Sequence, residues 1–296
     1  MPRLTAIVPA TDSPPTLATC VAAIESADEP PEELIVIREG GAPSSARNAG
    51  AQEASGDVLV FVDADVVPHA DAFARIRGAF DADDHLTAVF GSYDDSPAAP
   101  GTVSVFRNLL YHHVHQSSAG PATTFWTGLG AVRRDAFLAV EGFDPDQRWL
   151  EDVDLGIRLS TRGARIVLDP AVQGTHLKYW SLGEMVRTDF ARRGIPWVDL
   201  MLRHRGTSNE LNLAWRHRAS AAVSVVAAVS VLRRKPRIAV SALAALVVLN
   251  APFYRLLLQR RGPVEAAIGV LLHAVHHLTG ALAAPVGVVL HLLRRR

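Results

Sequence analysis

Cysteine is nearly absent from this sequence of 296 residues, in which Cys20 is the only one. A single thiol excludes a disulfide within the chain, which fits a reducing compartment. We also expect no signal peptide, because the first apolar run, Leu4 to Pro9, is too short for one. We therefore expect the polar part of the chain to stay in the cytoplasm.

Acidic residues almost vanish from the last part of the sequence. From Arg216 onward there are 12 Lys and Arg but a single acid, Glu265, which gives this tail a charge of +11. The other 18 basic residues accompany 29 acidic ones, so the remainder carries −11. Because an acidic domain repels nucleic acid, we expect no nucleic-acid partner. A basic tail with apolar runs suits an anionic membrane surface.

The tail contains three apolar segments rich in Ala, Val and Leu, at 219–232, 238–254 and 264–293. A membrane-spanning helix needs about 20 apolar residues, so the first segment is short, the second adequate and the third long. One arrangement has three spans. The other has two spans after an interfacial hairpin, which would keep the basic cluster 233–237 on the cytoplasmic side. A soluble bundle of buried helices is the remaining alternative.

Before this tail, short apolar runs alternate with helix-like stretches, which is typical of a mostly parallel sheet built from βα units. The runs read as strands lie at 4–8, 34–37, 58–62, 87–91 and 165–168. The helices expected between and after them include 13–25, 103–116, 151–162, 182–193 and 197–202. We predict an α/β domain over residues 1–205. A membrane-anchoring region with two or three apolar helices would cover residues 206–296.

Two acidic residues, Asp63 and Asp65, follow the continuously apolar strand 58–62. Ligands of open α/β sheets collect beyond the carboxyl ends of the strands. Two carboxylates held there by a buried strand need a compensating charge. A divalent cation would supply it, and a nucleotide diphosphate would complete its coordination. We expect Asp65 to bind the metal directly and Asp63 to hold the ribose or the donor sugar.

Several short motifs occur in the order found in a known family: Ile7 to Ala10, Ala46 to Gly50, Gly56 to Asp65, Thr127-Gly128, Gly142 to Asp144, Glu151-Asp152 and His176. In these motifs the sequence resembles the bacterial family 2 glycosyltransferases, which have the GT-A fold, a Rossmann-like fold that binds nucleotide-diphospho-sugars. The resemblance covers residues 4–197. It implies a nucleotide-sugar donor and Mg²⁺ or Mn²⁺ as the cofactor.

The resemblance also implies roles for individual residues. Pro9 and Ala10 would line the base and ribose pocket, and Arg47 would lie near the nucleotide. Asp152 is similar to the general base that deprotonates the acceptor hydroxyl, with Glu151 as an orienting group. The positions expected on the acceptor or diphosphate side include Thr127 and Gly128. His176 looks like an additional metal ligand.

Two departures from the family pattern limit what the resemblance implies. The family often has Asp-Asp-Gly-Ser after the second strand, where an aspartate recognises uracil. This chain has Arg38-Glu39-Gly40-Gly41, so Glu39 would take that role and UDP is expected but not fixed. Processive members carry Gln-x-x-Arg-Trp. In its place stand Arg192, Arg193 and Trp197, which would lie on the diphosphate or membrane side. We therefore expect single sugar additions.

The sequence thus predicts an inverting, metal-dependent glycosyltransferase of the hexosyltransferase type. It would act at the cell membrane with its catalytic domain facing the cytoplasm, on a lipid or glycan acceptor of the cell envelope. Two alternatives stay open. One is a catalytically silent, glycosyltransferase-like membrane scaffold. The other is a sugar nucleotidyltransferase, although the segment Ala10 to Pro14 lacks the Gly-rich loop with Arg and Lys that such an enzyme needs.

Overall fold

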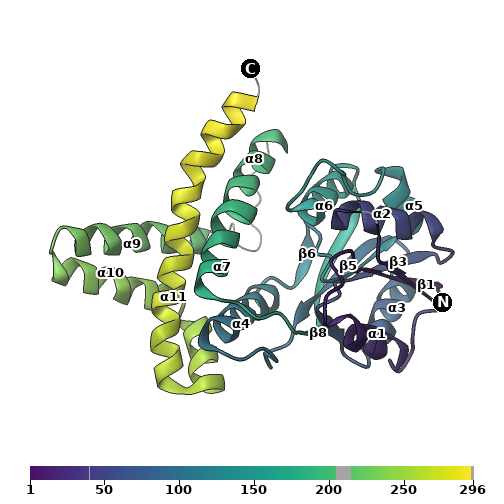
Figure 1. Cartoon of the computed structure of the whole chain (residues 1–296), viewed down its shortest axis with the longest axis horizontal. Coiled ribbons are helices and arrows are strands. Elements are labelled where there is room, and N and C mark those ends of the chain that lie inside the picture. The colour runs from purple at the N-terminus through teal and green to yellow at the C-terminus, as the bar shows by residue number, and fades with distance from the viewer. Residues whose placement is uncertain (40, 205–214, 295–296) are drawn as a thin grey trace. The chain divides into compact units, whose positions relative to one another are not determined.

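The computed structural model describes residues 1–39, 41–204 and 215–294, and its contacts divide the chain into two units (Figure 1). The first unit consists of Met1–Ala98 and His115–Lys178, and the second of Ala99–Val114 and Tyr179–Arg296. The domain boundary predicted between residues 205 and 206 lies outside the described residues.

The first unit is built on a sheet with the strand order β2-β1-β3-β7-β5-β8-β4, and β6 pairs with β8. The strands are β1 Leu4–Pro9, β2 Glu33–Ile37, β3 Val58–Val62, β4 Val66–Pro68, β5 Leu86–Tyr93, β6 Gly120–Ala122, β7 Leu129–Arg133 and β8 Arg165–His176. β1 is parallel to β2 and β3, and β5 is parallel to β8. Because β7 is antiparallel to both β3 and β5, the strands β1, β2, β3, β5 and β8 all run in one direction. The predicted α/β fold with a mostly parallel sheet is confirmed.

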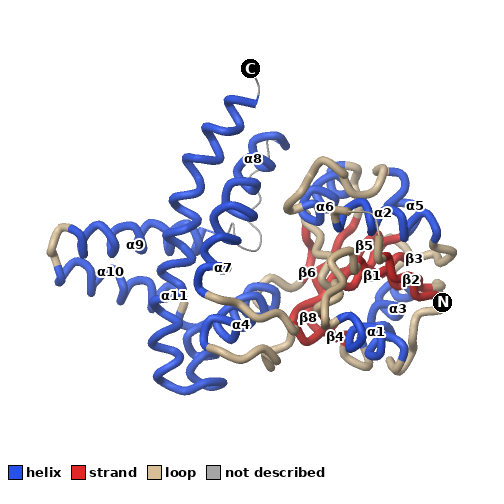
Figure 2. The backbone as a smooth tube through the Cα atoms, in the orientation of Figure 1, coloured by secondary structure: helices blue, strands red, loops and turns tan. Residues whose placement is uncertain are grey.

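Helices flank this sheet on both sides (Figure 2). They are α1 Leu17–Glu25, α2 Pro43–Glu53, α3 Ala72–Ala82, α5 Arg134–Ala139 and α6 Glu151–Thr161. A backbone hydrogen bond from Asp28 to Ala70 joins the segments beside α1 and α3 on one side. On the other side, the Asn48 amide of α2 donates to the Phe143 carbonyl beyond α5. With both faces covered, β3 is buried along its whole length, as its apolar sequence predicted.

The first helix begins later than predicted. Ser13 has a φ of +49°, which lies in the left-handed region and is incompatible with a first helical turn. α1 therefore starts at Leu17, with Thr16 as its N-cap.

The second unit is helical. Its elements are α4 Thr102–Gln116, which extends two residues beyond this unit, α7 Leu182–Arg187, the π-helix η1 Thr188–Gly194, α8 Ile195–His204, α9 Trp215–Leu232, α10 Pro236–Leu249 and α11 Ala251–Arg294. Gly194 and Pro196 were expected to separate two helices, yet the chain stays helical through both.

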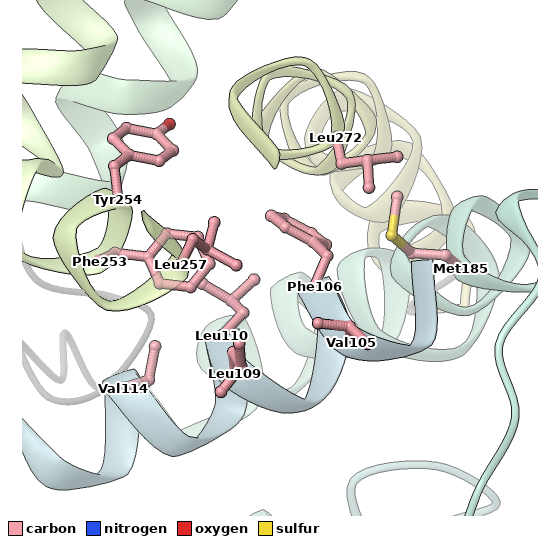
Figure 3. Packing of buried hydrophobic residues seen from close by; sticks show 10 residues of the cluster. All are labelled: Val105, Phe106, Leu109, Leu110, Val114, Met185, Phe253, Tyr254, Leu257 and Leu272. Atoms are coloured by element: carbon pink, nitrogen blue, oxygen red, sulfur yellow. The ribbon is translucent and has the colours of Figure 1, made fainter. Parts of the chain in front are cut away.

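A core of buried apolar side chains joins α4 to α7 and α11 (Figure 3). Phe106 of α4 meets Phe253 of α11 edge to face, with ring centroids 5.7 Å apart. Leu109 and Leu257 are also buried there, and Met185 of α7 closes one end. Each such side chain contributes about 1.5–3 kcal/mol when it is fully buried. This core explains why α4 belongs with helices that lie far along the sequence.

The apolar tail forms helices whose ends differ from the predicted segments. The second apolar run does not continue through residue 254, because α10 ends at Leu249 and α11 begins at Ala251. Asn250 lies at this break and donates from its amide to Ser220 Oγ at 2.9 Å. Within α11, Gly262 has a φ of +83°, so the helix is interrupted there. Among the described residues, α11 is the one helix long and apolar enough to cross a membrane, because it contains an 18-residue stretch with a mean hydropathy of 1.4.

Candidate active site

The short strand β4 brings Asp65 next to His176. After β3 the chain turns sharply, because the backbone N–H of Val66 donates to the Asp63 carbonyl. β4 then pairs antiparallel with the end of β8, which sets Val66 opposite His176. The His176 Nε2 atom lies 3.5 Å from Asp65 Oδ2. The two residues predicted as metal ligands, 111 positions apart in sequence, are therefore neighbours in the fold.

Arg47 connects the first carboxylate of the site to the helix that carries the predicted base. Its side chain on α2 is buried and donates to Asp63 Oδ1 and to Glu151 Oε1, both at 2.7 Å. The guanidinium also lies over the Phe143 ring at 5.6 Å. Arg47 was predicted near the nucleotide. In this structure both of its terminal nitrogens bond carboxylates, so it fixes the spacing between Asp63 and Glu151.

The site carries more negative than positive charge. Burial raises the pKa of Asp63, and the charges of Asp65 and Glu151 add to this rise, so the pKa stays above its ordinary value despite Arg47. Burial and the charges of Asp63 and Asp65 also raise the pKa of the Cys20 thiol to about 12. Burial is the largest cause of both shifts, and the neighbouring carboxylates add to it. A cation would relieve the part that comes from their charge.

The pKa of Asp65 shifts in the opposite direction from that of Asp63. Burial acts to raise its pKa, but the hydrogen bond and charge of His176, together with the charge of Lys178, hold the pKa below the ordinary value. Of these two aspartates, Asp65 is therefore the one that ionises more readily. An ionised carboxylate beside an imidazole suits a divalent cation.

Aromatic rings hold His176 in place. The imidazole is buried and stacks on the Tyr93 ring, with centroids 4.2 Å apart and planes 7° from parallel. Tyr93 in turn meets the Trp126 ring edge to face at 4.8 Å. Tyr93 did not emerge from the sequence, because the strand expected to end at residue 91 extends as β5 to Tyr93. The apolar run of this strand stops before the functional residue, so hydropathy alone gives no signal for it.

The motif Thr127-Gly128 shapes the space beside these rings. A Cβ atom at Gly128 would overlap the Trp126 indole, so only glycine fits there. Thr127 is buried, and the Gly128 carbonyl accepts a hydrogen bond from the Asp63 backbone N–H. The motif therefore ties the Trp126 wall to the loop that carries the acidic pair.

The predicted base lies in the first turn of α6. Leu150 precedes the helix in a left-handed conformation, with a φ of +61°, and turns the chain so that Glu151 and Asp152 begin the helix. The Asp152 carboxylate accepts the backbone N–H of Val153 at 2.8 Å and is half-buried. The N-terminus of a helix favours negatively charged side chains, which suits the two carboxylates placed there.

The residues predicted to bind the nucleotide lie at the carboxyl ends of β1 and β2. Ala10 donates its backbone N–H to the Ile37 carbonyl, which joins the two strand ends. Its side chain is fully buried, whereas Pro9 is half-buried and Glu39 is exposed. These ends and the end of β3 share one edge of the sheet. Arg192, Arg193 and Trp197 belong to the second unit.

The donor set fits a divalent cation that is only partly coordinated by protein. Across residues 1–39, 41–204 and 215–294, no group of three or more His, Cys, Asp or Glu side chains is arranged to hold a metal. Asp65 and His176 would thus provide two ligands. Mg²⁺ and Mn²⁺ sites that act on phosphates typically take their other ligands from the phosphate oxygens and water.

Residues 35–140 match the family model described as glycosyl transferase family 2. Over the chain, a mannosyltransferase from Pyrobaculum calidifontis, solved with GDP-Man and Mn²⁺, is similar in structure. Its TM-score is 0.58 at 18% identity, and the match covers 96% of this chain and 87% of that one. Residues 35–140 thus match family 2 glycosyltransferases, and the chain has the fold of that mannosyltransferase. The fold class predicted from the motifs, GT-A, is thereby confirmed.

Two further solved structures are similar at lower TM-scores. S. aureus TarS 1-349 has a TM-score of 0.47 at 10% identity, covering 81% of this chain and 90% of that one. Glucosyl-3-phosphoglycerate synthase from Mycobacterium tuberculosis has a TM-score of 0.47 at 17% identity, covering 69% and 80%. A comparison with curated proteins finds no match.

Proposed function

We propose that this chain is an inverting, metal-dependent glycosyltransferase that transfers one sugar from a nucleotide-diphosphate donor to a hydroxyl of a lipid or glycan acceptor at a membrane. The observation that carries the proposal is the pairing of Asp65 with His176, 3.5 Å apart, beside Asp63. An excess of carboxylates at the carboxyl edge of a parallel sheet suits a cation bound to a diphosphate.

Asp152 would act as the general base. The acceptor hydroxyl is a poor nucleophile until a base takes its proton, and such a base contributes about 10²–10⁴-fold to the rate. As the acceptor oxygen bonds to the anomeric carbon, the bond from that carbon to the diphosphate oxygen breaks. Asp152 takes the hydroxyl proton, and the diphosphate leaves with the electron pair. Because the chain needs no carboxylate nucleophile, one displacement inverts the anomeric configuration.

Arg47 would hold the donor side and the base side of the site at a fixed distance from each other. Its bonds to Asp63 and Glu151 link the strand end that holds the donor to the helix that holds the base. A cation on Asp65 and His176 would neutralise charge on the departing diphosphate. A positioning error of about 1 Å can cost about 100-fold in rate, so this bridge supports the reaction without touching the substrate.

The donor remains open between two nucleotide classes. Glu39 stands where the family often has the uracil-binding aspartate, which favours UDP-sugars. The similar mannosyltransferase was solved with GDP-Man, so GDP-sugars are the second class. The action at a membrane is supported by α11, which has the length and composition of a spanning helix. The basic tail favours a cytoplasmic orientation for the catalytic unit.

The test uses the purified full chain with Mn²⁺ and a panel of UDP- and GDP-sugars, and it measures donor binding and release of the nucleotide diphosphate. We expect one donor to bind and to be turned over. Asp152→Asn should bind that donor as tightly as the wild type but lose about 10²–10⁴-fold in turnover.

Asp146→Asn is the matched control, because Asp146 is an exposed acid in the loop before α6. It should leave both quantities unchanged. Turnover retained in Asp152→Asn would remove Asp152 as the base. Failure of every donor to bind in the presence of Mn²⁺ would instead favour the silent scaffold.

A further inference from the structure

The sheet of the catalytic unit begins with β2 and ends with β4, and these two outer strands differ in how open they are to further pairing. β4 has only three residues and ends in Pro68, and both features discourage another strand from adding to it. β2 has five residues, four of which are aliphatic, and it contains no proline or lysine. Its pairing with β1 runs in step without a bulge. Of these two edges, that of β2 is therefore the one on which another strand can add.

The polar backbone groups of β2 alternate between β1 and the open edge. The Ile37 carbonyl accepts a hydrogen bond from the backbone N–H of Ala10, so the N–H and C=O groups of Ile37 face β1. In a strand these two groups point to the same side at one residue and to the opposite side at the next. Leu34 and Val36 therefore direct their N–H and C=O groups outward. In the part of the chain that the structure describes, β2 pairs with β1 alone, so these groups are open to a partner strand.

The side chains of β2 make this edge apolar on both faces of the sheet. Ile37 lies on the face that α2 covers, because a Cβ atom added at Gly50 of α2 would lie 3.5 Å from its side chain. Ile35 shares that face, and Leu34 and Val36 lie on the other one. All four side chains are only half-buried, although helices cover both faces of the sheet. A second strand beside β2 would remove more of this apolar surface from water.

We propose that the β2 edge pairs antiparallel with the β2 edge of a second copy of this chain, which joins the two sheets into one. In an antiparallel pair, two opposite residues that both point outward exchange two hydrogen bonds. The register centred on Ile35 sets Leu34 of each copy opposite Val36 of the other, so the outward groups of both strands are all satisfied. Because both copies use the same surface, the contact closes as a two-fold dimer and does not continue into a fibre.

The charges at the two ends of β2 also favour a second copy as the partner. Glu32 precedes the strand and Arg38 follows it, and both are exposed. Because they are equally far from Ile35, each Arg38 lies opposite Glu32 of the other copy. Arg38 has no ion pair among the described residues, and the Glu32 side chain, which binds Arg77 at 3.0 Å, is still 39% exposed. Two pairs of opposite charge would thus flank the apolar centre, whereas parallel pairing in register would bring like charges together.

This dimer does not rest on the proposed sugar transfer, because no residue of β2 takes part in the proposed metal binding or catalysis. A chain that dimerises but transfers no sugar would disprove the proposed function and leave this interface intact. A chain that transfers sugar as a monomer would do the reverse.

Disulfide trapping of the full chain in dodecyl maltoside micelles tests the register. Ile35 would meet its own copy on the two-fold axis in a non-hydrogen-bonded pair, where opposite Cα atoms are about 4.5 Å apart, within the range of a disulfide. Ile35→Cys should therefore form a covalent dimer on mild oxidation with copper phenanthroline, as seen by non-reducing gel electrophoresis. The native Cys20 is fully buried and should not react.

Ile37→Cys is the matched control, because it replaces a half-buried isoleucine on the same face of β2. In the proposed register the two introduced thiols would lie four residues apart along the strands, about 14 Å, which no disulfide can bridge. Cross-linking to the same extent in both variants, or none in Ile35→Cys, would contradict the proposal.

A further variant tests the hydrogen bonds. Val36→Pro removes an N–H that points outward and that the single chain does not use, so the fold should be kept, with an unchanged far-UV circular dichroism spectrum. Because the dimer loses one hydrogen bond from each copy, its dissociation constant in sedimentation equilibrium should rise about tenfold or more. A wild-type chain that stays monomeric at every concentration, or an unchanged dissociation constant in Val36→Pro, would overturn the proposal.

Discussion

Each unit of the chain buries an arginine against one or two carboxylates, but the two clusters differ in charge balance. In the catalytic unit, Arg47 is the buried cation bonded to Asp63 and Glu151, and Asp65 lies nearby. In the helical unit, Asp189 is a single carboxylate that receives Arg107 and His276. The cluster around Arg47 therefore has more negative than positive charge, whereas the charge of Asp189 is fully compensated by Arg107 and His276.

The pKa values of Asp63 and Asp189 are shifted in opposite directions, in keeping with this difference in charge. Burial acts to raise both. For Asp63, the neighbouring carboxylates add to that effect, and its pKa lies above the ordinary value. For Asp189, the charges of His276, Arg107 and Arg193 outweigh burial, and its pKa lies well below the ordinary value. A compensated cluster stabilises the fold, whereas a cluster with excess negative charge would suit the cation of the proposed function.

The largest effect is expected from breaking the compensated pair. Arg107→Leu would leave Asp189 buried without its bidentate partner, and removal of one member of a buried pair costs about 3–5 kcal/mol. We therefore expect the helical unit to lose that much stability in urea unfolding followed by tryptophan fluorescence. Added Mn²⁺ should not restore it.

The control for this variant is an exposed pair of the same chemistry. Arg75 of α3 bonds the N-cap residue Asp71 at 2.7 Å, with the two side chains 46% and 45% exposed. Arg75→Leu should change the unfolding free energy by less than about 1 kcal/mol. Equal losses in both variants would show that the buried cluster in the helical unit is not a stabilising element.

A smaller effect is expected from pH. Because the pKa of Asp189 is depressed in the folded state, its contribution to stability is complete above the ordinary pKa of about 4. It is lost as the pH falls below that value, since protonation removes the charge facing Arg107, His276 and Arg193. Asp189→Asn should be less stable than the wild type at pH 7, and its stability should fall less steeply between pH 5 and pH 3. A slope as steep as that of the wild type would contradict this assignment.

Much of the catalytic unit could be predicted from sequence because its signals are local. The apolar strand 58–62 and the acids after it lie in one stretch, and periodicity identified α6. The strand β4 was missed because three residues between two turns carry no periodicity. Its pairing with β8, which brings His176 to Asp65, is a long-range contact that only the fold reveals.

The helical unit shows where sequence patterns stop being informative. The segment 103–116 was read as a helix, and α4 confirms it. Its packing against α11 could not be foreseen, because an apolar face does not say which partner covers it. His276 and Asp189 are 87 residues apart, and neither stands in a motif.

Metal-dependent donor binding tests the central claim most directly. Isothermal titration of the nucleotide sugar into the wild type should show binding with Mn²⁺ and at least tenfold weaker binding after chelation. Asp65→Ala should bind weakly in both conditions, and Asp84→Ala, which removes an exposed acid, should behave like the wild type. If Asp65→Ala kept the affinity of the wild type and its dependence on Mn²⁺, Asp65 would not be a metal ligand and the account of the acidic cluster would be wrong.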